Sequence, residues 1–207
     1  MSAPSESSAS PAGDPSLRRL RVLLLGEGGL MASLVDSLAD ADGEGGGGVS
    51  AGGVDEAVSD GEGLGGPAQL AASGPRAEGS REDYELLIET IYEGYLLHYA
   101  KPRVALTSDQ DLALLAGDRL YALGLARLVA LGDLAAVAEL ADAISLSALA
   151  LGAGAPELAD AVWTAGARAI GWGSSETHRR AKDLVLTGSS KAIEAMRTSA
   201  ASLAAPR

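Results

Sequence analysis

The chain has 207 residues, with no Cys, no Phe and a formal net charge of −12. The lack of Cys excludes disulfides, thiolate metal sites and cysteine nucleophiles, and it fits the reducing cytoplasm that we expect as the location. The acidic balance argues against a nucleic-acid-binding protein, because phosphate binding needs a basic surface.

Residues 1–80 are predicted to form a long disordered, low-complexity region. Residues 1–16 are rich in Ser, Pro and Ala, which leaves little to bury. Residues 43–79 contain 13 glycines in 37 positions. Ordering such a segment costs backbone entropy with few apolar groups in return, so we interpret it as a flexible linker. A short apolar segment at 17–42 has the spacing of a short amphipathic helix, and the sequence leaves open whether it folds.

The following residues, 81–173, are predicted to form a helical domain, because apolar side chains recur there at helical spacing. A first helix begins near Arg81 and ends before Pro102. A second helix covers 111–131, with Thr107 or Ser108 as its N-cap.

The third helix is expected to begin after Asp133 and to reach about residue 151. A fourth helix begins at Pro156, a residue favoured in the first helical turn. Residues 174–207 are predicted to form weaker, peripheral C-terminal helices. Since no alternating strand pattern follows residue 81, the expected fold class is all-α: a small antiparallel helical bundle after a long disordered N-terminal region.

The predicted helix at 111–131 is apolar on every side, yet it carries Asp118. Such a helix is expected to be enclosed by neighbours. The carboxylate then needs a partner, and the candidates are His98, Lys101 and Arg103. The alternative is that one side of this helix meets water. Because charged residues interrupt its apolar run, we expect no membrane-spanning helix.

The first predicted helix carries two groups of candidate site residues. Glu85, Glu89 and Glu93 recur every four residues as an acidic stripe, which is either a cation site or a solvated face. Tyr92 and Tyr95 are candidates to line an apolar ligand cavity. The alternative is that they are bulky packing residues in a core that has no Phe.

One stretch of the chain resembles a known family. "LALLAGDRLYALGLARLVALGD" is similar to the "LAGDYL-ARA" helix of the trans-isoprenyl (polyprenyl) diphosphate synthases. The longer stretch "LLIETIYEGYLLHYAKPRVALTSDQDLALLAGD" also has the family's order of acidic helix, basic loop with proline, and "LAGD" helix. The resemblance implies antiparallel helices around an apolar cavity for a prenyl chain. It also implies Mg²⁺ held by two aspartate-rich motifs.

Several positions of this chain match the family's first motif and the loop after it. Glu89 and Glu93 match metal-binding aspartates, so the resemblance makes them candidate Mg²⁺ ligands. Lys101 and Arg103 fall where the family binds diphosphate, and Asp118 would organise this basic loop. These five residues, with Tyr92 and Tyr95, are the candidate metal and ligand site.

The chain also departs from the family's pattern. Thr90 stands where the family has a second aspartate, and glutamate is one methylene longer than aspartate, which loosens an octahedral Mg²⁺ site. No second aspartate-rich motif is present, and the resemblance covers only about residues 84–150. We therefore assign no catalytic residue. We expect a non-catalytic or weakly active synthase-like protein that binds an isoprenoid chain or serves as a partner subunit.

A second hypothesis is a helical protein-interaction module on a flexible acidic tether, without small-molecule chemistry. Four helices with few aromatic residues do not suffice to cover the apolar helix at 111–131. Both hypotheses therefore predict a homo-oligomer or a larger protein complex. An exposed apolar face that joins another chain would favour the interaction module, and an internal cavity would favour the synthase-like protein.

Overall fold

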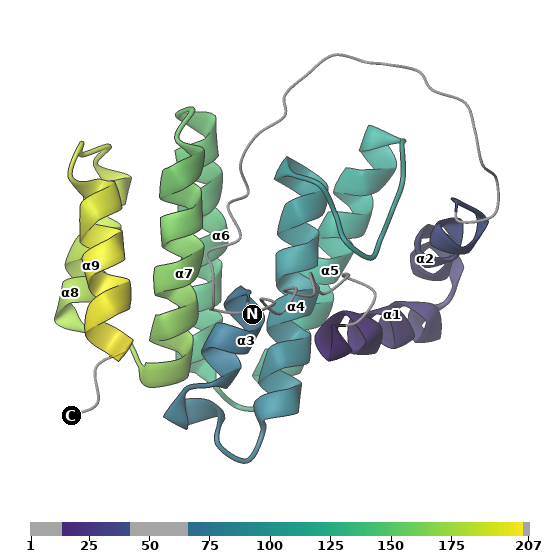
Figure 1. Ribbon diagram of the computed structural model, residues 1–207, viewed down its shortest axis with the longest axis horizontal. Helices are drawn as coiled ribbons and strands as arrows, with labels where there is room; N and C mark the ends of the chain where they lie inside the picture. Colours follow the sequence, from purple (N-terminus) through teal and green to yellow (C-terminus); the bar gives the residue numbers. More distant parts are fainter. Residues whose placement is uncertain (1–13, 42–65, 205–207) are drawn as a thin grey trace, which may run out of the picture.

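The computed structural model describes residues 14–41 and 66–204, and these residues form α-helices and one short 3-10 helix without any strand. The expected all-α fold class is therefore confirmed. Helices α4 to α9 run alternately up and down, and α1 and α2 lie at one side (Figure 1). The bounds are α1 Pro15–Glu27, α2 Gly29–Ala41, α3 Pro67–Ala72, η2 Pro75–Ala77, α4 Arg81–Tyr99, α5 Gln110–Ala130, α6 Leu134–Gly152, α7 Pro156–Trp172, α8 Glu176–Leu186 and α9 Ala192–Ala204.

Side-chain caps begin several of these helices, as the sequence predicts. The carboxylate of Asp133 accepts a hydrogen bond from the backbone N–H of Ala136 at 3.0 Å, and Pro156 occupies the first turn of α7. The predicted N-cap of α5 is wrong, because Asp109 caps this helix instead and accepts a hydrogen bond from Leu112 N–H at 3.1 Å. Thr107 Oγ1 accepts a hydrogen bond from the Asp109 N–H and so supports that cap.

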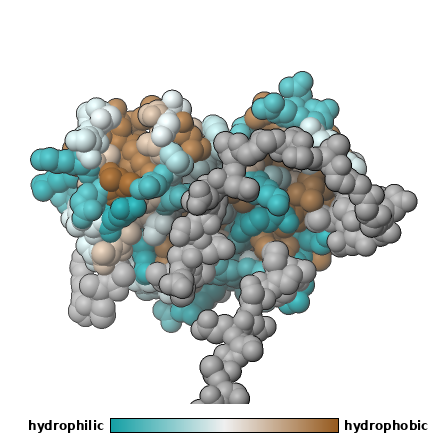
Figure 2. Space-filling view, turned by 45° about the horizontal axis from the view of Figure 1, so that its top comes forward, coloured by the Kyte–Doolittle hydropathy of each residue, from teal (hydrophilic) through white to brown (hydrophobic). Residues whose placement is uncertain are grey.

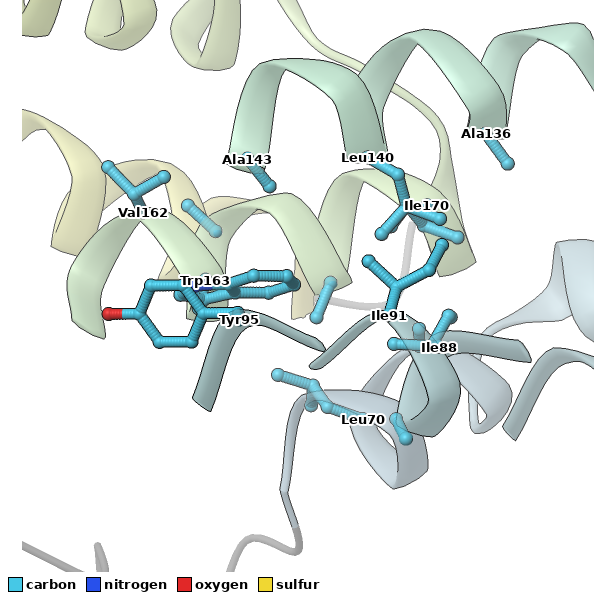
Figure 3. Close-up of a cluster of buried hydrophobic side chains, with 14 of the residues drawn as sticks. Leu70, Ile88, Ile91, Tyr95, Ala136, Leu140, Ala143, Val162, Trp163 and Ile170 are labelled. Carbon is cyan, nitrogen blue, oxygen red and sulfur yellow. The ribbon is translucent and has the colours of Figure 1, made fainter. Parts of the chain in front are cut away.

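The larger hydrophobic core joins α3, η2 and all the helices from α4 to α9, with Leu128 as the buried residue from α5. Ile88 and Ile91 of α4 point toward Leu140 of α6 and Ile170 of α7, and Leu70 of α3 lies below them (Figure 3). All five side chains are buried. Helices α8 and α9 also contribute buried residues to this core, so the C-terminal helices are firmly docked at the end of the row.

Part of the region expected to be disordered is ordered in the structure. Residues 14–41 form α1 and α2, and residues 66–80 contain α3 and η2. Helix α1 folds because one face buries Leu20 and Leu24 in a second hydrophobic cluster with α2, α4 and α5. The remaining parts of the predicted linker and N-terminal tail, 1–13 and 42–65, lie outside the described residues.

Glycines allow α4 and α5 to approach closely. A Cβ at Gly117 would lie 2.4 Å from Cδ2 of His98, and a Cβ at Gly124 would lie 2.3 Å from Cγ1 of Ile91. Real side chains do not make such short contacts. The two glycines are seven residues apart and therefore lie on one face of α5. They fix this face as the one that packs on α4.

The prediction that neighbours enclose the helix at 111–131 is wrong. One face of α5 is buried, but the opposite face is open, and Leu115 and Val129 are exposed on it. The apolar pattern predicts a buried stripe correctly, but it does not show that no helix among residues 14–41 and 66–204 covers the other side. Helix α6 has the length and apolar composition of a membrane-crossing helix, which core helices also have, and among the described residues it is the one helix of this kind.

Candidate functional site

A buried ion cluster joins α4 to the loop that follows it. Glu93 is fully buried, and its Oε1 accepts hydrogen bonds from three consecutive backbone N–H groups. The donors are Arg103 at 2.7 Å, Val104 at 2.6 Å and Ala105 at 3.1 Å. The other oxygen, Oε2, lies 3.3 Å from Nε of Arg103. A carboxylate held by this many donors fixes the loop against the helix.

Glu89 lies one helical turn earlier in the same cluster and is 1% exposed. Its Oε2 accepts a hydrogen bond from Nη2 of Arg103 at 2.5 Å, and its Oε1 lies 3.5 Å from the hydroxyl of Ser16. Burial raises the pKa of Glu89 above its ordinary value, and the nearby Arg103 guanidinium opposes this rise. The cluster thus links α4, the loop and the start of α1.

The N-terminus of α1 is anchored beside this cluster. Asp14 caps α1 through the backbone N–H of Ser16 at 2.8 Å, and it accepts a hydrogen bond from the amide of Gln69 on α3 at 2.9 Å. Despite some burial, the hydrogen bonds from Ser16 and Gln69 lower the pKa of Asp14. At Glu89 and Glu93, the predicted acidic stripe is therefore a structural junction that joins α4 to the following loop and to α1. Glu85, the third member, forms an ion pair with Arg19 of α1.

The cluster does not fit a Mg²⁺ ion. Mg²⁺ needs carboxylate oxygens arranged with water or substrate in near-octahedral geometry. Here Arg103 and backbone N–H groups bind the oxygens of Glu89 and Glu93 instead. Within residues 14–41 and 66–204, no group of three or more His, Cys, Asp and Glu side chains is arranged to hold a metal ion. The geometry gives no support to the candidate metal ligands.

The candidate ligand residues Tyr92 and Tyr95 lie in an aromatic cluster with Trp163 of α7. The Tyr92 ring lies edge-on to Trp163 with centroids 4.9 Å apart. The Tyr95 ring lies beside Trp163 (Figure 3), with ring centroids 5.1 Å apart. The Arg103 guanidinium lies 5.1 Å from the centroid of the Tyr92 ring. Burial raises the pKa of Tyr95, because ionisation would leave a charge in the core. These rings pack α4 on α7.

The remaining candidates, Lys101 and Asp118, lie apart from the ion cluster. Lys101 is exposed. The side chain of Asp118 is 72% exposed, so the prediction that it is enclosed among apolar residues is wrong. Its Oδ1 lies 3.2 Å from Nε2 of His98, one of the three predicted partners, at ion-pair distance but without a hydrogen bond. Arg103 instead pairs with Glu89 and Glu93, so Asp118 does not organise the loop through Arg103.

A second buried polar network joins α6, α8 and α9, and the sequence analysis missed it. His178 is 2% exposed, with Nδ1 2.9 Å from the hydroxyl of Ser199 and Nε2 3.1 Å from Oε2 of Glu139. Lys182 donates to Glu139 at 3.0 Å and to Asp142 at 2.6 Å. The pairs Glu139 and Asp142, and His178 and Lys182, have helical spacing, which is the signal that could have indicated two facing polar surfaces.

This network joins a serine, a histidine and a carboxylate, as hydrolytic sites do, but it has no access for a substrate. Ser199 is fully buried, and the residues around His178 leave no cavity that admits even a water molecule. Burial by itself would raise the pKa of Glu139, but hydrogen bonds from His178, Lys182 and Ser174 lower it to about 2. The network therefore stabilises the docking of α8 and α9 on α6.

Exposed apolar side chains gather on the outer surfaces of α5 and α6 and in the turn between them. In the described residues, six of the ten exposed large hydrophobic side chains lie on α5, on α6 or in the turn between them. In Figure 1, α5 lies against α4 and α6 lies against α7. Figure 2 shows further apolar side chains that reach solvent on the side of the molecule that faces the viewer. We name the outer surface of α5, α6 and their turn the α5–α6 face. It comprises Leu115, Ala122, Ala126, Val129, Leu131, Leu134, Ala138, Ala141, Ser145 and Leu149, all exposed.

Comparison of the chain with protein families, with curated proteins and with solved structures finds no match.

Proposed function

We propose that this protein is a non-catalytic helical subunit that assembles with a helical partner through the α5–α6 face. The observation that carries the proposal is the gathering of exposed large hydrophobic side chains on two consecutive helices and the turn between them. Leu134 is 69% exposed, and Val129 is 54% exposed. Exposed apolar side chains that gather in one region mark protein interaction sites in soluble proteins.

The ion cluster supports a role without metal-dependent chemistry. A Mg²⁺ site would need the oxygens that Glu89 and Glu93 give to Arg103 and to three backbone N–H groups. Transferring these carboxylate oxygens to a cation would leave the Arg103 guanidinium and the backbone N–H groups without their acceptors, at a cost of several kcal/mol. The same atoms cannot both hold the loop and coordinate a cation.

A relationship to the polyprenyl diphosphate synthases remains part of this proposal. It is favoured by the meeting of Glu89 and Glu93 with Arg103, since the resemblance places acidic and basic groups at these positions. In this version the chain is a synthase-like partner subunit, and its acidic and basic groups bind each other in place of Mg²⁺ and diphosphate. An isoprenoid chain is the ligand that this relationship would suggest.

The chemical part of the proposal is tested by thermal unfolding with Mg²⁺ and a prenyl diphosphate. We expect no rise in Tm that requires both additives, and no release of inorganic diphosphate. A Mg²⁺-dependent rise that the Glu89→Gln variant abolishes would overturn the non-catalytic assignment. The Glu157→Gln variant is the control, because Glu157 is exposed on α7.

The assembly part is tested by the size of the complex that contains the protein in an extract of its own cells. We expect the wild-type chain to elute in a larger complex and the Leu134→Asp variant to elute as a monomer. Leu186→Asp is the matched control, since Leu186 is 64% exposed on α8 and lies outside the α5–α6 face. Elution of wild type and Leu134→Asp at the monomer position would refute the assembly.

A further inference from the structure

We infer that α1 and α2 act together as a strap, which detaches from the rest of the fold as one unit and thereby exposes an apolar surface of α4 and α5. The strap comprises residues 14–41. Proteins open locally where a segment has few buried contacts and where water can replace its polar contacts. The contacts that join α1 and α2 to the other helices have this character.

A sharp turn makes α1 and α2 a single unit. Gly28 and Gly29 in this turn have φ angles of 69° and 51°, a conformation that favours glycine. The two helices pack against each other, and each has 13 residues. Helices of this length are marginal in water by themselves. Neither helix is therefore expected to stay ordered after the other has left, so they detach together.

The strap has a hydrophobic cluster that is separate from the larger core. Its buried side chains pack on α4, on α5 and on the loop between these helices. They are Leu17, Leu20, Leu24, Met31, Leu34 and Val35. The residues described for the larger core include none from α1 or α2. Detachment of the strap would therefore leave the packing of α4 on α6 and α7 in place.

Most of the ion pairs that hold the strap lie at the surface. Glu27 at the end of α1 pairs with the exposed Arg119 of α5 at 2.8 Å. Arg19 pairs with Glu85 and, at 3.4 Å, with the exposed Glu82. Exposed pairs contribute little to stability, because water screens them and solvates the separated charges. Breaking them therefore adds little to the free energy of detachment.

Docking of the strap also has costs that detachment removes. Nε of Arg19 is buried and has no hydrogen-bond partner in the described part of the chain, which disfavours the docked state. The hydroxyl of Ser16 lies 3.5 Å from Oε1 of the buried Glu89, and the negative charge of Asp14 opposes the ionisation of Glu89. Detachment returns these groups to water. The docked and detached states are therefore closer in free energy than the apolar contacts alone would make them.

The surface beneath the strap is apolar. It is formed by Leu97, Val104, Ala105, Ala116 and Leu120. The backbone N–H of Leu106 donates a hydrogen bond to the carbonyl oxygen of Leu34 at 3.0 Å, so α2 lies against the loop between α4 and α5. The strap lies at the side of α4 and α5 that is away from α7 to α9 (Figure 1). The opening of the strap therefore controls how often this surface meets solvent.

Hydrogen exchange of the full chain in low urea measures the opening. The amides of α1 are expected to exchange through an opening that is more frequent and less sensitive to urea than the opening that exposes α7. Ile170→Val weakens the larger core and is expected to speed exchange in α7 by roughly fivefold. It is expected to leave α1 unchanged, because the detached state keeps the contacts of Ile170.

A second pair of variants acts on the strap itself. Leu20 is fully buried, so Leu20→Ala is expected to speed exchange in α1 and α2 by about thirtyfold or more. Val22→Ala is the matched control, since Val22 lies on the same helix and is 70% exposed. Its effect on exchange is expected to be less than about threefold.

A single thiol reports on the surface beneath the strap. The chain has no native Cys, so Ala105→Cys and Ala165→Cys would each carry the sole thiol. Both alanines are fully buried, Ala105 beneath the strap and Ala165 in α7. Ala105→Cys is expected to react with an alkylating reagent at least about tenfold faster, because the strap opens more often than the core. Adding Leu20→Ala is expected to speed this reaction further.

Three results would overturn the inference. The first is equal acceleration of exchange in α1 and α7 by Ile170→Val, which would mean that the strap opens only when the whole fold does. The second is alkylation of the two thiols at the same rate. The third is a lack of protection in α1 and α2 of the wild-type chain, which would mean that the strap is not docked in solution.

Discussion

The guanidinium of Arg103 lies 2.5 Å from Glu89 and 3.3 Å from Glu93, two carboxylates that are otherwise buried. Glu89 and Glu93 are one helical turn apart on α4, and Arg103 reaches both from the following loop. Without this cation, two negative charges would share a site shielded from water. When two buried carboxylates lie one helical turn apart, their like charges make it unfavourable for both to be ionised at once.

Replacing Arg103 with methionine is therefore expected to destabilise the fold by about 3 kcal/mol, since removing one member of a buried ion pair leaves an uncompensated charge. The measurement is urea unfolding at neutral pH. Lys101→Met is the control, because Lys101 is exposed in the same loop, and it is expected to change stability by less than about 0.5 kcal/mol. Similar small losses in both variants would show that the ion cluster does not hold the loop.

The sequence predicts the helices of the domain well because their ends have local signals. Asp133 and Pro156 mark two helix starts, and both positions are confirmed. The sequence signal for α1 as a helix is weaker, because its apolar face is short. In the structure, Leu20 and Leu24 are the fully buried leucines of that face. The order of α1 depends on contacts with α4 and α5, which are distant in sequence.

The candidate site is less predictable for a related reason. A helical projection places Glu89 and Glu93 on one side of a helix, but it does not show which atoms face that side. Three backbone N–H groups of residues 103–105 bind Glu93, and backbone donors leave no trace in residue types. The projection also places Asp118 among apolar residues, but it does not reveal that, within the part of the chain that the structure describes, this side of α5 is left exposed.

Asp118→Ala is expected to reduce the free energy of unfolding by no more than about 0.5 kcal/mol, because exposed ion pairs contribute little. The side chain is 72% exposed, and water screens its interaction with His98. Thermal and urea unfolding of the variant measure the effect. A loss of about 2 kcal/mol or more, the size expected for an unsatisfied buried polar group, would mean that Asp118 is enclosed in solution.

Glu139 predicts a pH dependence of stability. Its pKa is about 2 in the folded chain, against an ordinary value of 4.5. The unfolded chain therefore binds this proton more readily, so the stabilisation is present above pH 4.5 and is lost as the pH falls toward 2. In this window, Glu139→Gln is expected to lose less stability than wild type.

The measurement for Glu139 is the free energy of unfolding of both proteins across that acid range. Other carboxylates titrate in the same window, so the difference between the two curves is the relevant quantity. Glu157→Gln, on an exposed residue, serves as control and is expected to follow the wild-type curve. Parallel curves for wild type and Glu139→Gln would contradict a role of the His178–Lys182 network in setting this pKa.

Gly124→Ala is expected to destabilise the protein by about 2 kcal/mol, although alanine is the better helix former. The new Cβ would lie 2.3 Å from Cγ1 of Ile91 and 3.1 Å from the backbone oxygen of Leu87, both buried between α4 and α5. Gly26→Ala is the matched control, since a Cβ at this position on α1 meets nothing within 4 Å. That variant is expected to gain about 0.5–1 kcal/mol from helix propensity. Urea unfolding of both variants measures the two effects, and a gain at Gly124 as well would show that α4 and α5 are not in close contact there.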